Sequence, residues 1–189
     1  MAIKMSNITL ITGGARSGKS TFGEKLLKES DGIKGYIATA IPFDDGMKDR
    51  IKKHIERRPS NWKTYERPLK ISNSIKLISE ECDIVILDCI TVFLSNIMFE
   101  KNYNWEKISR EKIDEIEKNI IDEIKKIINN AKLYELNMII ITNEIGSGIV
   151  PDNKLSRIYR DIAGRVNQLL STLSNDVYVT ISGLPLKLK

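Results

Sequence analysis

The order of the apolar segments predicts an α/β fold with a mostly parallel central sheet flanked by helices. Short runs of Ile, Val and other β-favouring residues alternate with longer segments whose apolar residues recur at helical spacing. Such alternation is typical of right-handed strand–helix–strand units, which pair their strands in parallel. A glycine-rich loop joins the first predicted strand to the first predicted helix. We therefore expect a single domain over residues 1–189 that binds ligands at the carboxyl ends of its strands.

The strand predictions rest on short β-favouring runs bounded by turn residues. Residues 83–88 carry consecutive aliphatic side chains before an aspartate, which is typical of a strand buried on both faces of a parallel sheet. Residues 184–189 alternate after a glycine and are predicted to return as an edge strand. The other predicted strands cover residues 7–12, 35–40, 62–66, 138–142 and 177–182.

Helices are predicted where apolar residues recur every three or four positions. The helix that follows the glycine loop covers residues 21–28. The next begins near Asp44 or Asp45 and buries a stripe of Met47, Ile51 and Ile55. The remaining predicted helices open at Pro68, cover 92–99 and 105–136, and follow a cap at 151–153 to about residue 173.

The composition limits the classes of protein. The 189 residues are 41% hydrophobic, enough for a core, and contain no apolar run of about 18 residues that would span a membrane. No signal peptide is expected, and the two cysteines, Cys82 and Cys89, lie too far apart along a strand to form a disulfide. The net charge of +5 is dispersed among Glu/Lys mixtures. These features favour a cytoplasmic protein that does not bind nucleic acid.

The glycine-rich loop has the spacing of a phosphate-binding loop. It reads Gly13-Gly14-Ala15-Arg16-Ser17-Gly18-Lys19-Ser20, between a strand and a helix. The glycines allow backbone N–H groups to surround phosphate oxygens, and the helix N-terminus adds partial positive charge. Lys19 is expected to reach the β- and γ-phosphates, and the Ser20 hydroxyl to ligate Mg²⁺. A glycine turn before a lysine is the alternative; we favour a P-loop NTPase fold with a RecA-like sheet.

Two further residues carry candidate chemistry. Asp88 ends the buried strand 83–88, where a carboxylate holds Mg²⁺ opposite Ser20 or, alternatively, only caps the next helix. His54 is the single histidine of the chain and lies in a basic stretch that also suits an ordinary surface helix. A neutral imidazole is nevertheless a competent nucleophile toward phosphorus at pH 7.

Polar residues of the carboxyl-terminal half are less informative. Arg157, Asp161 and Arg165 are spaced four apart and suit a surface ion ladder, while Gly164 suits close approach by another chain, helix or ligand. Asn143 and Glu144 follow a strand, as γ-phosphate-sensing groups do, and equally suit a turn.

Separated stretches of the chain occur together in one known family. They are 12–20, Tyr36-Ile37-Ala38-Thr39, 50–54 with Arg58 and Trp62, 87–91, 95–96, 142–146 with 148–151, 160–168 and 183–187. On these motifs the chain resembles the bifunctional adenosylcobinamide kinase / adenosylcobinamide-phosphate guanylyltransferase family of cobalamin biosynthesis. The match covers nearly the whole chain in the same order.

The resemblance implies two reactions. ATP or GTP phosphorylates the aminopropanol hydroxyl of adenosylcobinamide, and GTP then transfers GMP to adenosylcobinamide phosphate through a histidine that matches His54. Lys19 and Mg²⁺ offset charge on the departing pyrophosphate. The resemblance also implies a homotrimer and one antiparallel edge strand. The implied nucleotide contacts match Gly13, Gly14, Ala15, Arg16, Ser17, Gly18, Lys19, Ser20, Ala38, Thr39, Ile55, Glu56, Arg57, Arg58, Glu66 and Asp88.

Other functions remain open on the sequence. A small-molecule kinase without the second activity, a nucleic-acid-stimulated ATPase and a nucleotide-binding switch all share a phosphate loop. The residues do not identify the preferred phosphoryl donor, the corrinoid pocket or the general base of the kinase step.

Overall fold

The described part of the chain folds around one seven-stranded sheet with the order β3-β2-β4-β5-β1-β6-β7. The computed structural model describes residues 6–42, 45–56 and 58–189, without the side chains of Met47, Arg50, Lys53 and His54. All neighbouring strands are parallel except β6 and β7, so the mostly parallel sheet and its antiparallel edge strand are confirmed. The strands are β1 (Ile8–Gly13), β2 (Lys34–Ala38), β3 (Lys63–Glu66), β4 (Ile84–Asp88), β5 (Asn137–Ile141), β6 (Asp176–Ile181) and β7 (Leu184–Lys187).

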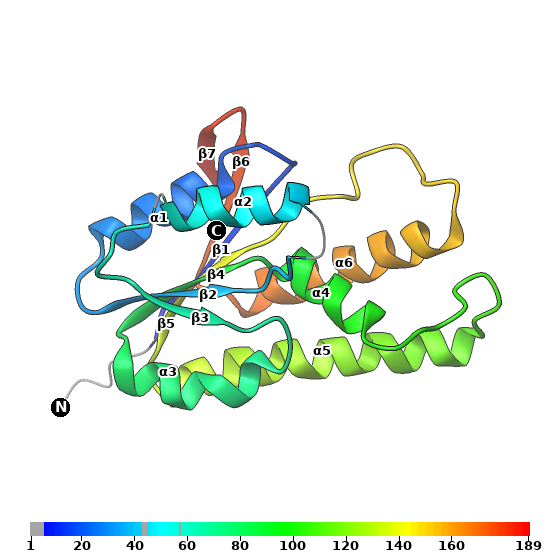
Figure 1. Cartoon of the computed structure of the whole chain (residues 1–189), viewed down its shortest axis with the longest axis horizontal. Coiled ribbons are helices and arrows are strands. Elements are labelled where there is room, and N and C mark those ends of the chain that lie inside the picture. The colour runs from blue at the N-terminus through cyan, green and yellow to red at the C-terminus, as the bar shows by residue number, and fades with distance from the viewer. Residues whose placement is uncertain (1–5, 43–44, 57) are drawn as a thin grey trace.

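Helices lie on both sides of this sheet (Figure 1). On one side lie α1 (Lys19–Glu29) and α2 (Asp45–Glu56). The other side carries α3 (Ile75–Glu81), α4 (Ile90–Phe99), α5 (Arg110–Leu133) and α6 (Lys154–Leu173). In the described residues, none of these helices is long and apolar enough to cross a bilayer.

The core has two layers because the central strands are buried on both faces. In β4, Val85 and Leu87 belong to the larger apolar cluster, while Ile86 belongs to the smaller one. The larger cluster includes the apolar stripe of α5, and the smaller includes Leu27 of α1. Alternate side chains of a strand point to opposite faces, so the aliphatic run of β4 fills both layers.

The long amphipathic helix is shorter than the prediction of 105–136. Helix α5 begins at Arg110, after the Ser109 hydroxyl accepts a hydrogen bond from the Lys112 N–H at 3.3 Å. Trp105 instead packs edge-on against Phe99 and Tyr103 and is 9% exposed. A helix extended back to residue 105 would forfeit this cap, so tertiary packing of the indole overrides the helical pattern.

Two other helix predictions need correction. Ile55 is 51% exposed and does not form a buried stripe, because it borders the hollow described below; Met47 lies outside the described side chains. The helix predicted to open at Pro68 begins instead as a 3₁₀ turn, Ile71–Ser74, and continues as α3. Lys70 has a φ of 51°, and this left-handed residue cannot be part of a right-handed helix.

Candidate active site

The loop between β1 and α1 has the conformation that its glycines require. Gly18 has a φ of 96° and stands directly before the first residue of α1, Lys19. A side chain at Gly13 would approach the Thr180 carbonyl oxygen to 2.5 Å, so only glycine fits against β6. Gly14, Ala15 and Arg16 are exposed at the tip of the loop. The loop therefore presents its backbone to solvent at the amino end of a helix, which is a site for an anion.

Lys19 and Ser17 are held inward on this loop. The Lys19 side chain is buried, and its ammonium donates to the Gly14 carbonyl oxygen at 2.6 Å. The Ser17 hydroxyl lies 2.7 Å from the Thr180 hydroxyl, and the Ser17 carbonyl accepts from the Gly183 N–H at 2.9 Å. The ammonium is thus fixed above the loop, and the turn between β6 and β7 supports the loop from behind.

Asp88 lies at the same edge of the sheet as the loop. Asp88 and Ile11 both pair with Ile141 of β5, so they are level and two strand spacings apart, about 10 Å. One carboxylate oxygen of Asp88 accepts from the Tyr36 hydroxyl at 2.9 Å. Burial, and then the Asp88 charge, raise the pKa of the Tyr36 phenol well above its ordinary value, so the hydroxyl stays protonated and donates.

The donor set suits Mg²⁺ that arrives with a nucleotide. Mg²⁺ usually takes one or two protein oxygens and fills its remaining positions with phosphate and water. Ser20 at the start of α1 and Asp88 at the end of β4 supply a hydroxyl and a carboxylate. The described residues include no group of three acidic, histidine or cysteine side chains that would form an all-protein metal cage.

A hollow of about 130 Å³ opens beside Asp88, under α2. Its lining includes several residues that the sequence assigns to nucleotide contact: Ala38, Ile55, Arg58, Glu66 and Asp88. The residues of the lining that the sequence analysis missed are Tyr36, Ala40, Pro42, Ile51, Thr64, Cys89 and Val92. The sequence could have indicated Tyr36 as a lining residue, because on a strand it shares a face with Ala38, two positions later.

The other described residues predicted to contact the nucleotide do not line this hollow. Thr39 is buried, and its hydroxyl accepts from the Cys89 N–H and donates to the Cys89 carbonyl, both at 2.9 Å, so the side chain ties β2 to the end of β4. Glu56 is exposed at the end of α2. His54 belongs to α2, but its side chain, like residue Arg57, lies outside the described part.

A larger hollow of about 630 Å³ lies at the opposite edge of the sheet. It is lined by residues from the amino ends of strands, including Asn7, Ile84 and Asn137. Parallel sheets bind ligands beyond the carboxyl ends of their strands. The loop and the smaller hollow are therefore the candidate active site.

The polar residues that follow β5, Asn143 and Glu144, lie at the same edge of the sheet as the phosphate loop. The Glu144 N–H donates to the Gly13 carbonyl at 2.9 Å, while its carboxylate accepts from the Gly146 N–H at 2.7 Å. The Asn143 amide donates to the Thr91 hydroxyl at 2.6 Å. Hydrogen bonds within the protein therefore hold both residues in place, and Glu144 contacts the first residue of the phosphate loop.

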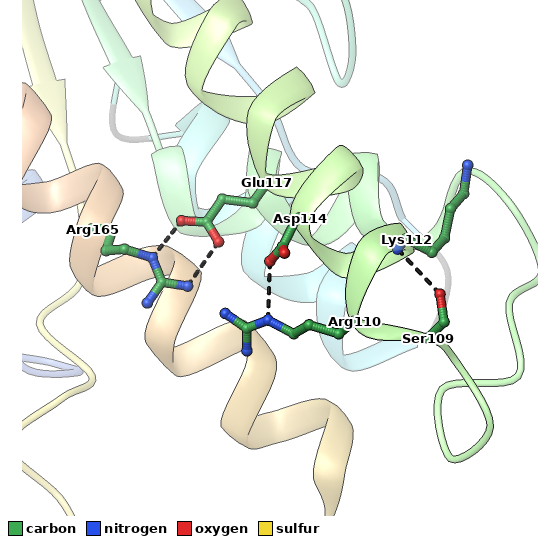
Figure 2. Close-up of polar contacts among 6 residues, drawn as sticks. All are labelled: Ser109, Arg110, Lys112, Asp114, Glu117 and Arg165. Carbon is green, nitrogen blue, oxygen red and sulfur yellow. Dashed lines mark hydrogen bonds and ion pairs between the residues drawn. The ribbon is translucent and has the colours of Figure 1, made fainter.

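The predicted ladder of Arg157, Asp161 and Arg165 does not form as a ladder. Figure 2 shows Arg165 reaching from α6 to Glu117 of α5. Asp161 pairs with Arg160 at 3.3 Å, and Arg157 donates to backbone carbonyls before α6. The interhelical pair forms because α5 and α6 pack side by side, which the spacing within one helix cannot reveal.

The mostly parallel sheet and the glycine-rich loop between β1 and α1 together define an α/β protein of the P-loop class, in which β5 lies between β1 and β4. A KaiC-like protein of Pyrococcus horikoshii superposes with a TM-score of 0.47 and 13% identity, over 93% of this chain and 71% of that one. The sequence comparisons are more specific. This chain belongs to the cobinamide kinase / cobinamide phosphate guanyltransferase family, whose model matches residues 9–188.

Two bacterial relatives match this chain over nearly their whole length. The chain is 39% identical to the bifunctional adenosylcobalamin biosynthesis protein CobU of Escherichia coli, over 95% of this chain and 98% of the relative. It is 37% identical to the protein of that name from Salmonella typhimurium, again over 95% and 98%. The resemblance inferred from the motifs is confirmed, and the chain is a transferase of cobalamin biosynthesis with kinase and guanylyltransferase activities.

Proposed function

We propose that both transfers take place at the edge formed by the phosphate loop and the hollow under α2. ATP or GTP bound to the loop phosphorylates the aminopropanol hydroxyl of adenosylcobinamide. GTP bound at the same loop then donates GMP to the new phosphate through His54. The observation that carries this proposal is that α2, to which His54 belongs, and Asp88 border one hollow, while Asp88 lies level with Ile11 on the strand that leads into the loop.

The kinase step relies on positioning and charge. Backbone N–H groups of residues 13–20 and the Lys19 ammonium hold the β- and γ-phosphates, while the substrate oxygen attacks the γ-phosphorus and the nucleoside diphosphate leaves. Ser20 and Asp88 would hold Mg²⁺, which when bound supplies positive charge to the triphosphate. This chemistry requires no covalent intermediate on the protein.

The guanylyl step uses His54 as a nucleophile. A neutral ring nitrogen attacks the α-phosphorus of GTP, a nitrogen–phosphorus bond forms, and the bond to pyrophosphate breaks. Lys19 offsets the charge of the departing pyrophosphate. A phosphate oxygen of adenosylcobinamide phosphate then attacks the same phosphorus and displaces the imidazole. The product is adenosylcobinamide-GDP, and His54 returns to its starting state.

The remaining nucleotide contacts are proposed from their places around the hollow. Ala38, Ile55, Arg58 and Glu66 line it, and the Glu66 carboxylate is a suitable acceptor for the N–H groups of a guanine edge. Thr39, Glu56 and Arg57 are proposed as contacts from the family resemblance alone.

We also propose that residues 1–189 form one domain that assembles as a cytoplasmic homotrimer. The hairpin of β6 and β7 supports this idea, since it exposes four large apolar side chains at the edge of the sheet: Ile181, Leu184, Leu186 and Leu188. An exposed apolar edge strand favours association with another chain. Cys82 and Cys89 form no disulfide, which suits a reducing compartment.

Guanylylation of the protein tests the proposed function. Wild-type protein incubated with GTP labelled at the α-phosphate should acquire an acid-labile label, and His54→Ala should acquire none while keeping part of its kinase activity. Lys19→Ala should lose both activities, because the loop then lacks its phosphate-binding cation. A label on His54→Ala would overturn the assignment of the nucleophile. An unlabelled wild-type protein that still phosphorylates adenosylcobinamide would instead be a kinase alone.

A further inference from the structure

One side chain connects the two parts of the proposed site. Tyr36 lies in the middle of β2 and is 2% exposed. Its hydroxyl donates to a carboxylate oxygen of Asp88 at 2.9 Å, and the Arg58 guanidinium carbon lies 3.4 Å from the centre of its ring. The ring therefore has a proposed metal ligand at its edge and a cation from the end of α2 on its face.

The hydroxyl of Tyr36 fixes the rotation of the Asp88 carboxylate. On the paired strands, Tyr36 is level with Ile86, and Asp88 is two residues further toward the carboxyl edge. A phenol on β2 thus reaches diagonally along the sheet to the last side chain of β4. With one oxygen bonded to the phenol, the carboxylate keeps the other oxygen available for a ligand.

The ring of Tyr36 holds the turn at the end of α2. Arg58 follows His54 by four residues, and its N–H donates to the Ile55 carbonyl at 3.1 Å, so Arg58 is tied to the last turn of the helix. The Nε of its guanidinium is buried and makes no hydrogen bond with the described residues. Contact with the ring helps to hold this cation, since a guanidinium over a tyrosine face is a favourable arrangement.

We propose that Tyr36 is a positioning residue for both transfers, because its hydroxyl orients Asp88 and its ring, through Arg58, sets the place of the His54 helix above the nucleotide. This inference rests on the proposed function, in which His54 carries GMP and Asp88 holds Mg²⁺. It adds a residue that touches neither the reacting phosphorus nor the acceptor.

The hydroxyl and the ring are tested separately. Tyr36→Phe keeps the ring and removes the hydroxyl. Calorimetry without turnover measures how much Mg²⁺ is needed to enhance GDP binding by half of its maximum. This Mg²⁺ concentration should rise about tenfold in the variant. At a limiting Mg²⁺ concentration its rate of His54 labelling should fall below that of wild type. An unchanged Mg²⁺ requirement would overturn the role of the hydroxyl.

The ring is tested on the rate of His54 labelling at saturating GTP and Mg²⁺. Tyr36→Leu and Arg58→Gln should each slow this rate about tenfold, and the double variant should be no slower than either single one. If Arg58 acted only by direct contact with GTP, Arg58→Gln would raise the half-saturating GTP concentration instead, and the two substitutions would multiply. Either result would overturn the role of the ring.

Two controls keep the outcomes distinct. Urea unfolding identifies a variant that folds poorly; Arg58→Gln alone then still separates a slower saturated rate from weaker GTP binding. If the wild-type protein acquires no label on His54, the proposed function has failed. If the wild type is labelled and all three single variants match it in labelling rate and Mg²⁺ dependence, only the role of Tyr36 has failed.

Discussion

The hydroxyl groups of Ser17 and Thr180 lie 2.7 Å apart and join the phosphate loop to β6, a strand 163 residues later in the chain. Both side chains are buried, Ser17 at 8% and Thr180 at 1% exposure. The turn after β6 adds a second bond, from the Gly183 N–H to the Ser17 carbonyl. The loop is therefore held by the last hairpin as well as by its own glycines.

Removing the Thr180 hydroxyl should weaken nucleotide binding. Thr180→Val keeps the shape of the side chain but leaves the buried Ser17 hydroxyl without this partner, a loss that typically costs about 1–3 kcal/mol. We expect calorimetry to give an affinity for GDP about tenfold lower, with Thr180→Ser close to wild type. Wild-type GDP affinity in Thr180→Val would show that the loop does not depend on the hairpin.

Substitution by alanine should change the stability of the protein in opposite directions at two helical glycines. A Cβ at Gly23 of α1 would lie 2.8 Å from the terminal methyl groups of Ile86 and Ile141, whereas one at Gly164 of α6 would meet nothing within 4 Å. Gly23→Ala should therefore lower the free energy of unfolding by about 1–3 kcal/mol through overpacking. Gly164→Ala should raise it by about 0.5–1 kcal/mol, since alanine favours helix.

Urea unfolding of both glycine variants at one protein concentration measures these changes. If Gly164→Ala proved as destabilising as Gly23→Ala, the surface around Gly164 would have to be covered by another chain. Its oligomeric state would then be compared with that of the wild type.

The ion pair between Arg165 and Glu117 should contribute little to stability. Two bonds join the side chains, one of them 2.8 Å long, but 46% of the Arg165 side chain is exposed (Figure 2). Glu117 raises the pKa of the Arg165 guanidinium, mainly through the hydrogen bond. We expect Arg165→Met to lose about 0.5–1 kcal/mol, and less at 1 M salt. A loss that salt does not reduce would indicate that packing, not charge, holds α5 to α6 there.

The edge hairpin should lose stability in acid through Asp176. A hydrogen bond from Lys187, followed by one from Asn7, lowers the pKa of the Asp176 carboxyl below its ordinary value of 3.8. Because the pKa is lower in the folded state, this contribution is complete above the unfolded value and is lost as the pH falls through the folded one. Asp176→Asn should lower the urea midpoint at pH 7 and converge with the wild type near pH 2. A constant difference across that range would contradict this assignment.

Local sequence was sufficient for the elements whose conformation depends on their own residues. The glycine spacing at 13–20 identified a loop that the structure places between β1 and α1, and the Asn153 cap of α6 was readable because its side chain bonds the Ser156 N–H only three residues away. The start of α5 was wrong by five residues, because Ile108 continues the helical pattern while Trp105 follows its aromatic neighbours into the core.

The sequence by itself determined the class of fold, the phosphate loop and the family, since each is encoded by residues close together or by motifs in a fixed order. Only the tertiary structure decided that Tyr36 lies between Asp88 and Arg58, that Thr180 supports Ser17, and that Arg165 pairs with Glu117. Each of these contacts joins residues far apart in the chain. Their geometry depends on strand order, register and helix packing, which cannot be predicted from the neighbours of a residue in the sequence.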